Sequence, residues 1–100
     1  MSLTNEWKKY LRQLGHSLKP VVTVASKGVS ETVLQELNRA LEDHELIKVK
    51  LSVDDKAAAI KTVCDSANAE LVQSIGHVLL IFRAAKKPNP KLSNLLKNQA

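Results

Sequence analysis

The stretch from Lys19 to Ser30, which reads KPVVTVASKGVS, limits the possible folds more than any other part of the chain. Its first half is a run of β-forming residues behind Pro20, and a proline is tolerated at the first position of a strand. Residues 26–28, Ser-Lys-Gly, interrupt this run. Ser30 is then a favourable N-cap, and Glu31 places an acid in the first turn of a helix. The stretch therefore predicts a strand, a tight loop and a helix.

The spacing of apolar residues places the other elements. Residues 3–14 carry Trp7, Leu11 and Leu14 on one side of a predicted helix, and Gly15 suits its end. Residues 44–53 form the clearest strand, because apolar side chains alternate there with polar ones. The remaining predicted elements are helices over residues 31–43 and 56–69 and strands over residues 71–75 and 78–83.

The resulting order, α-β-α-β-α-β-β, predicts an α/β fold: a four-stranded mixed sheet covered by helices. Each β-α-β step should join parallel strands through a right-handed crossover. The connection Gly76-His77 has only two residues, so the last two strands must be antiparallel, and its leading glycine suits a type II′ turn. Residues 1–85 are predicted to form a single domain. Residues 86–100 are predicted to form a basic, flexible tail, since Pro88 and Pro90 interrupt regular structure.

Charge is distributed unevenly along the chain, whose net charge is +5. Residues 1–29 carry five Lys/Arg against Glu6 alone, and residues 71–100 carry five against no acid. Residues 30–47 carry Arg39 against five acids. This asymmetry indicates a basic face that meets a polyanion, although a net charge of this size can also serve solubility alone.

Four parts of the chain carry candidate residues for binding an anion. The loop at residues 26–28 precedes a helix N-terminus, whose free N–H groups and positive dipole end favour an anion. An outward helix face and the polar side of the clearest strand supply further cations, each of which could also be ordinary solvated surface. The candidate residues are Ser26, Lys27 and Gly28 in the loop, Lys19 at the base of the first strand, Lys8, Lys9 and Arg12 on the first helix, and Lys48 and Lys50 on the second strand.

Other features exclude several classes of protein. Cys64 is the only cysteine, so no disulfide framework can form within the chain, and a reducing cytoplasm is the expected location. The three histidines lack the spacing of metal ligands, and we expect no metal or cofactor. No apolar run approaches the roughly 20 residues of a membrane span, and the first residues lack the layout of a signal peptide, so we expect no membrane partner. No P-loop or nucleophile–base set is visible, and we expect no enzyme.

Four separate motifs resemble one known family. They are LRQLGHSLKPVV at residues 11–22, SKGVS at 26–30, ALEDHELIKVK at 40–50 and VQSIGHVLLIFR at 72–83. Their order and spacing resemble the CRM domain, named for chloroplast RNA splicing and ribosome maturation, and above all its bacterial stand-alone YhbY-like members. The resemblance covers about residues 3–83. It implies a fold related to the C-terminal domain of translation initiation factor three, and RNA binding associated in bacteria with the precursor of the large ribosomal subunit.

The family's glycine-rich GxxG loop is similar in idea to the loop with which KH domains clamp an RNA backbone. Residues 25–28 occupy those four positions in this chain. Ala25 stands where the family has its first glycine, and its methyl group takes up room where a phosphate would approach the backbone. Lys27 and Gly28 retain the charge and the conformational freedom that the loop would need.

From the residues and the resemblance together, we expect a monomeric, non-catalytic RNA-binding protein. The expected partner is ribosomal RNA, or a pre-ribosomal particle, during assembly of the large subunit. One alternative is an adaptor that docks on proteins of a ribonucleoprotein particle through the acidic helix or the Lys-rich tail. Another is an enzyme acting on RNA or a nucleotide.

Overall fold

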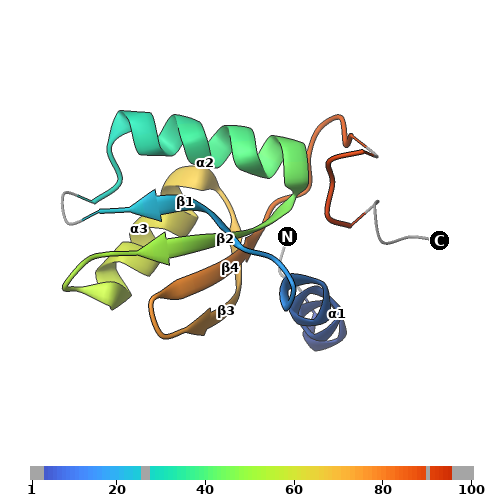
Figure 1. Cartoon of the computed structure of the whole chain (residues 1–100), viewed down its shortest axis with the longest axis horizontal. Coiled ribbons are helices and arrows are strands. Elements are labelled where there is room, and N and C mark those ends of the chain that lie inside the picture. The colour runs from blue at the N-terminus through green and yellow to red at the C-terminus, as the bar shows by residue number, and fades with distance from the viewer. Residues whose placement is uncertain (1–3, 26–27, 90, 96–100) are drawn as a thin grey trace.

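The computed structural model describes residues 4–25, 28–89 and 91–95. It confirms the predicted α/β fold with a four-stranded mixed sheet and three helices (Figure 1). In chain order the elements are α1 (Asn5–Gly15), β1 (Pro20–Val24), α2 (Glu31–His44), β2 (Leu46–Leu51), α3 (Lys56–Ala67), β3 (Glu70–Ile75) and β4 (Val78–Phe82). No helix within the described residues combines the length and the apolar character that crossing a bilayer requires.

Each helix begins at a polar side chain that caps it. The hydroxyl of Thr4 accepts a hydrogen bond from the Trp7 N–H at 3.2 Å, and that of Ser30, the predicted cap, accepts from the Val33 N–H at 3.2 Å. At α3 the carboxylate of Asp55 accepts from the backbone at 3.1 Å. Because these caps satisfy N–H groups that have no partner within the helix, they fix where each helix starts.

The strand order is β1-β2-β4-β3. β1 and β2 are parallel, whereas β4 lies between β2 and β3 and is antiparallel to both. The Gly76-His77 turn has a positive φ at Gly76 (+56°) and not at His77, which is the pattern of the predicted type II′ turn. The two outer strands each carry one extra residue in their pairing, at Val21 in β1 and at Val72 in β3.

One face of the sheet, called here the closed face, is covered by α2 and α3. Alternate residues of all four strands point into this layer. Leu51, Val49 and Leu79 are at most 1% exposed and pack with Leu37 and Leu41 of α2. The principal core of the protein is therefore aliphatic and lies between the sheet and these two helices.

The opposite face is covered only in part, by α1 and the C-terminal segment. Leu11 of α1 packs there on Leu46, Val72 and Leu80. Beyond this cluster, two cross-strand rows of paired residues form what is called here the open face. The first row is Pro20, Lys48, Leu80 and Gln73, and the second is Thr23, Lys50, Val78 and Ile75. Along β2 the side chains change from buried Leu46 through half-buried Lys48 to exposed Lys50, which marks where the cover ends.

Two features of α1 differ from the sequence prediction. Trp7 was expected on the buried stripe, but it is 48% exposed and meets Tyr10 edge-on, with ring centroids 5.7 Å apart. Gly15 is the last helical residue and has no positive φ. A Cβ there would lie 2.5 Å from Leu80, so this glycine allows α1 to approach β4 closely.

Residues 91–95 were predicted to belong to a flexible tail. In the structure they dock on the junction between α2 and β2. At the centre of this contact is Glu45, 6% exposed, with a positive φ of 63°. Its carboxylate accepts hydrogen bonds from the hydroxyl of the fully buried Ser93 at 2.7 Å and from the Ala85 N–H at 2.9 Å. The Asn94 side chain donates to the Leu46 carbonyl at 2.6 Å.

This contact also extends the apolar layer beneath α1, because Leu95 packs on the cluster around Leu11. His44 strengthens it by donating through Nδ1 to the Leu92 carbonyl at 2.9 Å. A buried carboxylate is costly unless it is hydrogen-bonded, so these donors hold the segment in a defined place.

Candidate nucleic-acid interface

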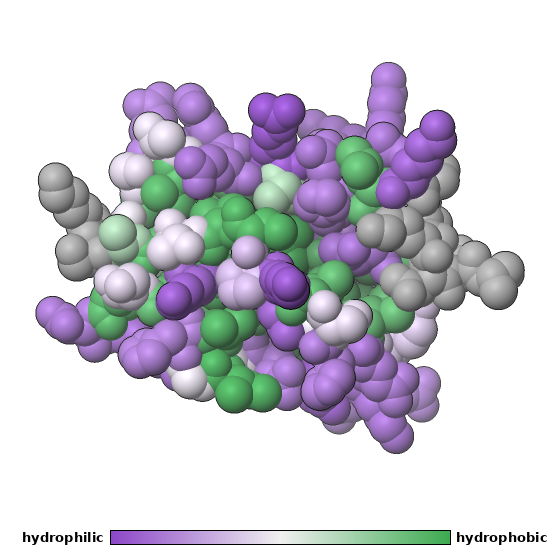
Figure 2. All heavy atoms as spheres, in the orientation of Figure 1, coloured by the Kyte–Doolittle hydropathy of each residue, from purple (hydrophilic) through white to green (hydrophobic). Residues whose placement is uncertain are grey.

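Lys48 and Lys50 project from β2 onto the open face, as the alternation predicted. Lys48 is half-buried beside the C-terminal end of α1, and Lys50 is exposed. Neighbouring strands place apolar side chains beside them, including Ile75, which is 65% exposed. On the molecular surface drawn in Figure 2, green apolar patches reach solvent over the strands between purple polar side chains. The open face thus combines positive charge with accessible apolar area.

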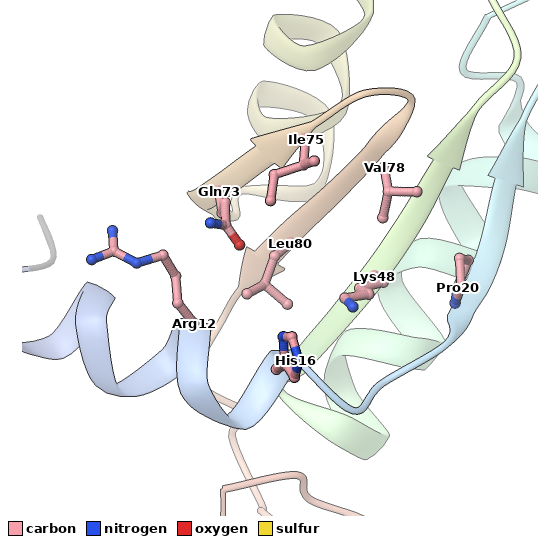
Figure 3. A pocket seen from close by; sticks show the side chains of 9 residues that line it. Arg12, His16, Pro20, Lys48, Gln73, Ile75, Val78 and Leu80 are labelled. Carbon is pink, nitrogen blue, oxygen red and sulfur yellow. The ribbon is translucent and has the colours of Figure 1, made fainter.

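The candidate residues of α1 divide between two environments. Arg12 is exposed and, with His16, lines a hollow between α1 and the open face (Figure 3). Lys8 is half-buried and Lys9 is exposed, and neither lines this hollow. Of the three predicted cations on this helix, the structure therefore brings one to the open face.

Lys19 lies just before β1 and is exposed. With Lys48 and the exposed Val21 it lines a separate depression of about 210 Å³. Lys48 therefore borders both concave regions, and it links Lys19 on one side with Arg12 on the other.

Ser26 and Lys27, two of the three loop residues that the sequence pointed to, lie outside the described residues. Gly28 is described: its φ is +83°, as a loop glycine would need, and its N–H donates to the Ala25 carbonyl at 2.8 Å. Nothing lies within 4 Å of the position that a Cβ would take on Gly28. The backbone there is open to a ligand, and the role of the loop itself stays a prediction.

Two acids lie beside this loop, directly before α3. Asp54 and Asp55 line a depression of about 280 Å³ together with Gly28. Two carboxylates disfavour a phosphate in that depression by like-charge repulsion. An anion at Gly28 would therefore have to approach from the side away from α3.

Among the described residues, the cations of the open face form no ion pair with an acid, although Asp54 lines a depression together with Lys50. Within the described residues one ion pair is present, between Arg83 and Glu42 at 3.6 Å. Arg83 also donates to the Asn38 side chain at 2.8 Å and to the Ala67 carbonyl at 2.7 Å, so it joins α2 to the end of α3. By contrast, Arg12, Lys48 and Lys50 have no carboxylate partner in the part of the chain that the structure describes. They are available to an external anion.

The candidate residues form a track rather than a cluster. In Figure 1, α1 and the carboxyl end of β1 lie toward opposite ends of the long axis, and the central strand β2 runs between them. Lys48 and Lys50 therefore bridge the region around Arg12 and the region around Gly28. Such a track suits a chain of phosphates better than a single small anion.

Three residues of this surface escaped the sequence analysis: His16, Gln73 and Ile75. His16 follows directly after α1, and its proximity to Lys48 depends on the path of the chain into β1. Gln73 and Ile75 reach the open face because of the extra residue in β3. Simple alternation from Leu71 would have turned both toward the closed face.

Other reactive groups give no sign of a catalytic centre in the described ranges. Cys64 packs against the core of the closed face, where burial raises the pKa of its thiol and Asp65 and Glu70 raise it further. A thiol with a raised pKa is a poor nucleophile. Within residues 4–25, 28–89 and 91–95, no three His, Cys, Asp or Glu side chains gather as a metal site would need.

Comparison with known proteins gives one consistent result. Residues 3–83 match the model of the CRS1/YhbY (CRM) domain. A Pseudomonas aeruginosa protein named a probable RNA-binding protein is 51% identical over 95% of this chain and 94% of its own length. A Haemophilus influenzae RNA-binding protein is 37% identical over 91% and 95%, respectively. A solution structure of a hypothetical Staphylococcus aureus protein, provisionally described as RNA-binding, superposes with a TM-score of 0.74 and 35% identity, covering 86% of this chain and 93% of that one.

Proposed function

The chain belongs to the CRS1/YhbY (CRM) domain family, and we propose that it is a non-catalytic RNA-binding protein acting on ribosomal RNA during assembly of the large ribosomal subunit. The relatives at 51% and 37% identity are named for RNA binding, which supports the first part. The ribosomal assignment extends from the family resemblance. The observation that carries the proposal is the row of cations on the open face that form no ion pair among the described residues: Arg12, Lys48 and Lys50.

RNA is bound in this proposal mainly through its phosphates. Each cation that contacts a phosphate releases a counterion, so affinity falls as salt rises. Lys48 and Lys50 supply two such contacts along β2, and Arg12 adds a guanidinium that can hold a phosphate with two hydrogen bonds. Lys19 lies at the border of the same surface. Lys8, Lys9, Ser26, Lys27 and Gly28 complete the proposed set as predictions from the sequence.

We propose that the protein acts as a monomer in the cytoplasm. Because Cys64 is the only cysteine, no disulfide within the chain needs an oxidising compartment, which supports that location. Binding without chemistry is proposed because the relatives are named for binding. The alternative is an adaptor that docks on proteins through the acidic outer surface of α2, and the experiment below also tests it.

The proposal is tested by filter binding with fragments of large-subunit and small-subunit ribosomal RNA across a range of salt concentrations. We expect tighter binding to the large-subunit fragment than to the small-subunit fragment. The slope of log affinity against log salt concentration should correspond to contacts with several phosphates. Arg12→Ala and Lys48→Ala should each flatten that slope by about 0.7 to 0.9. Lys61→Ala is the matched control, because Lys61 is exposed on α3 behind the closed face and should leave the slope unchanged.

The outcomes separate the parts of the proposal. Equal affinity for both subunit RNAs would overturn the large-subunit assignment. Absence of RNA binding, with capture of ribosomal proteins instead, would favour the adaptor. The same assay with Lys27→Ala tests the loop, where an unchanged slope would remove Lys27 from the contact surface.

A further inference from the structure

The hollow between α1 and the open face has a volume of about 300 Å³. Its lining comes from the strands of the sheet and from the C-terminal end of α1 (Figure 3). Lys48 comes from β2, Val78 and Leu80 from β4, and Gln73 and Ile75 from β3, while Pro20 of β1 and the end of α1 close the remaining sides. This volume is at the lower end of the range for small-molecule sites, and it is open on one side.

The lining divides into an apolar wall and a cationic rim. Ile75, Val78 and Leu80 form the wall and Lys48 stands at the rim, while Arg12 lies at the edge with its guanidinium pointing outward (Figure 3). Neither an aspartate nor a glutamate is among the described residues of the lining. A ligand that fits would carry a flat apolar group and a negative charge on the same molecule.

Two features of the backbone are specific to this hollow. The extra residue at Val72 lets Val72 pack under α1 while the next residue, Gln73, pairs with Leu80 and faces the hollow. Gly15 lets α1 approach Leu80 so closely that a Cβ would collide with it. Bulges commonly re-aim a side chain, and here the result is an amide beside an apolar wall. Gln73 can both donate and accept hydrogen bonds there.

We propose that the hollow binds one unpaired nucleotide of the RNA, which deepens the proposed function and rests on it. The base lies against Ile75 and Val78, the Gln73 amide pairs with the base edge, and Arg12 and Lys48 hold the adjoining phosphates. A base inside a duplex has its faces stacked and its edge paired, so only an unpaired base can enter. The protein thereby distinguishes single-stranded segments from helical RNA, which phosphate contacts alone do not do.

The experiment compares three labelled probes of equal length by fluorescence anisotropy: a short oligouridylate, the same oligomer in a duplex, and a ribose-phosphate backbone without bases. The wild-type protein should bind the oligouridylate more tightly than the other two. Ile75→Ser should weaken oligouridylate binding about fivefold, which is the lower end of what a base stacked on an aromatic side chain contributes, because Ile75 is aliphatic; binding of the abasic backbone should not change.

Leu92→Ser is the control, because Leu92 is an exposed apolar residue (39%) of the C-terminal segment that lines neither the hollow nor the depression beside Lys19. It should bind all probes as the wild type does. Gln73→Ala is a second test of the hollow and should reproduce the selective loss. Both Ile75 and Gln73 lie near solvent, and unchanged denaturation curves would show that their variants are folded.

The results separate this inference from the proposed function. If no probe binds the wild-type protein but the large-subunit fragment does in the filter assay, the hollow takes no base; if that fragment does not bind either, the proposed function fails. If the oligouridylate and the abasic backbone bind equally well, or if Ile75→Ser weakens both alike, the protein binds RNA but the hollow takes no base. Competition by polyglutamate as effective as that by oligouridylate would assign the hollow to an acidic peptide and overturn the inference.

Discussion

The closed and open faces are built by the same four strands, yet they differ in nearly every physical property. On the closed face, aliphatic side chains are sealed under two helices. On the open face, cations that have no acidic partner within the described part of the chain stand beside an apolar wall. In β2 the two kinds of residue alternate, so neighbours in sequence serve opposite purposes. The comparison teaches that the two-residue period of a strand such as β2 can place stabilising and candidate binding residues on opposite sides of one sheet, and single substitutions can test that separation.

The largest expected effect is on the closed face. Leu51→Ala should lower the free energy of unfolding by about 2–5 kcal/mol, because Leu51 is 1% exposed and its truncation leaves a cavity. Its neighbour Lys50 faces solvent, and Lys50→Ala should change stability by less than about 0.5 kcal/mol. Urea titration of both variants measures the difference. Equal losses would mean that the two faces are not separated as described.

A smaller effect is expected from two arginines that have opposite roles. Arg83→Ala should cost about 1.5–3 kcal/mol, since it removes charged hydrogen bonds between α2 and α3 and leaves the Ala67 carbonyl without this donor. Arg12→Ala should stay within about 0.5 kcal/mol of the wild type in stability, because Arg12 is exposed. Thermal unfolding and RNA binding measured side by side would sharpen the comparison. A destabilised Arg12→Ala variant would show that the open face also holds the fold together.

The smallest of the three effects concerns the C-terminal cover of the α1 side. A chain ending at Ala85 should lose about 1–2 kcal/mol of stability, because it lacks the Ser93 hydroxyl bond to Glu45 and the packing of Leu95. The control is the full chain with Lys86→Ala and Lys87→Ala, which removes charge but keeps the docked residues. An unchanged melting temperature of the shortened chain would instead favour the flexible tail that the sequence predicts.

Much of the architecture follows from local patterns in the sequence. The family resemblance and the order of elements are confirmed, and Ser30 caps α2 as predicted. The alternation of Val49 and Leu51 with Lys48 and Lys50 identified the two sides of β2. The cap and the alternation share a cause: each depends on residues within one or two turns or strand repeats of one another.

What escaped prediction depends on contacts between distant segments. The place of β4 between β2 and β3 is a choice among pairings that the turn length does not decide. Glu45 follows two other acids and reads as a solvated helix end, but Ser93, 48 residues later, buries it. The hollow depends on the close approach of Gly15 to Leu80 and on the bulge at Val72. Neither feature can be predicted from the local sequence.

The extra residues in β1 and β3 have a consequence for the protein's behaviour at high concentration. A sheet of order β1-β2-β4-β3 exposes the unpaired backbone of its two outer strands, and such edges can recruit other chains into intermolecular sheets. Here both edges are irregular, at Val21 and at Val72, and β1 also begins with a proline that has no N–H to offer. Irregular edges are poor templates for further strands. We therefore expect that the exposed apolar area of the open face does not lead to edge-to-edge aggregation.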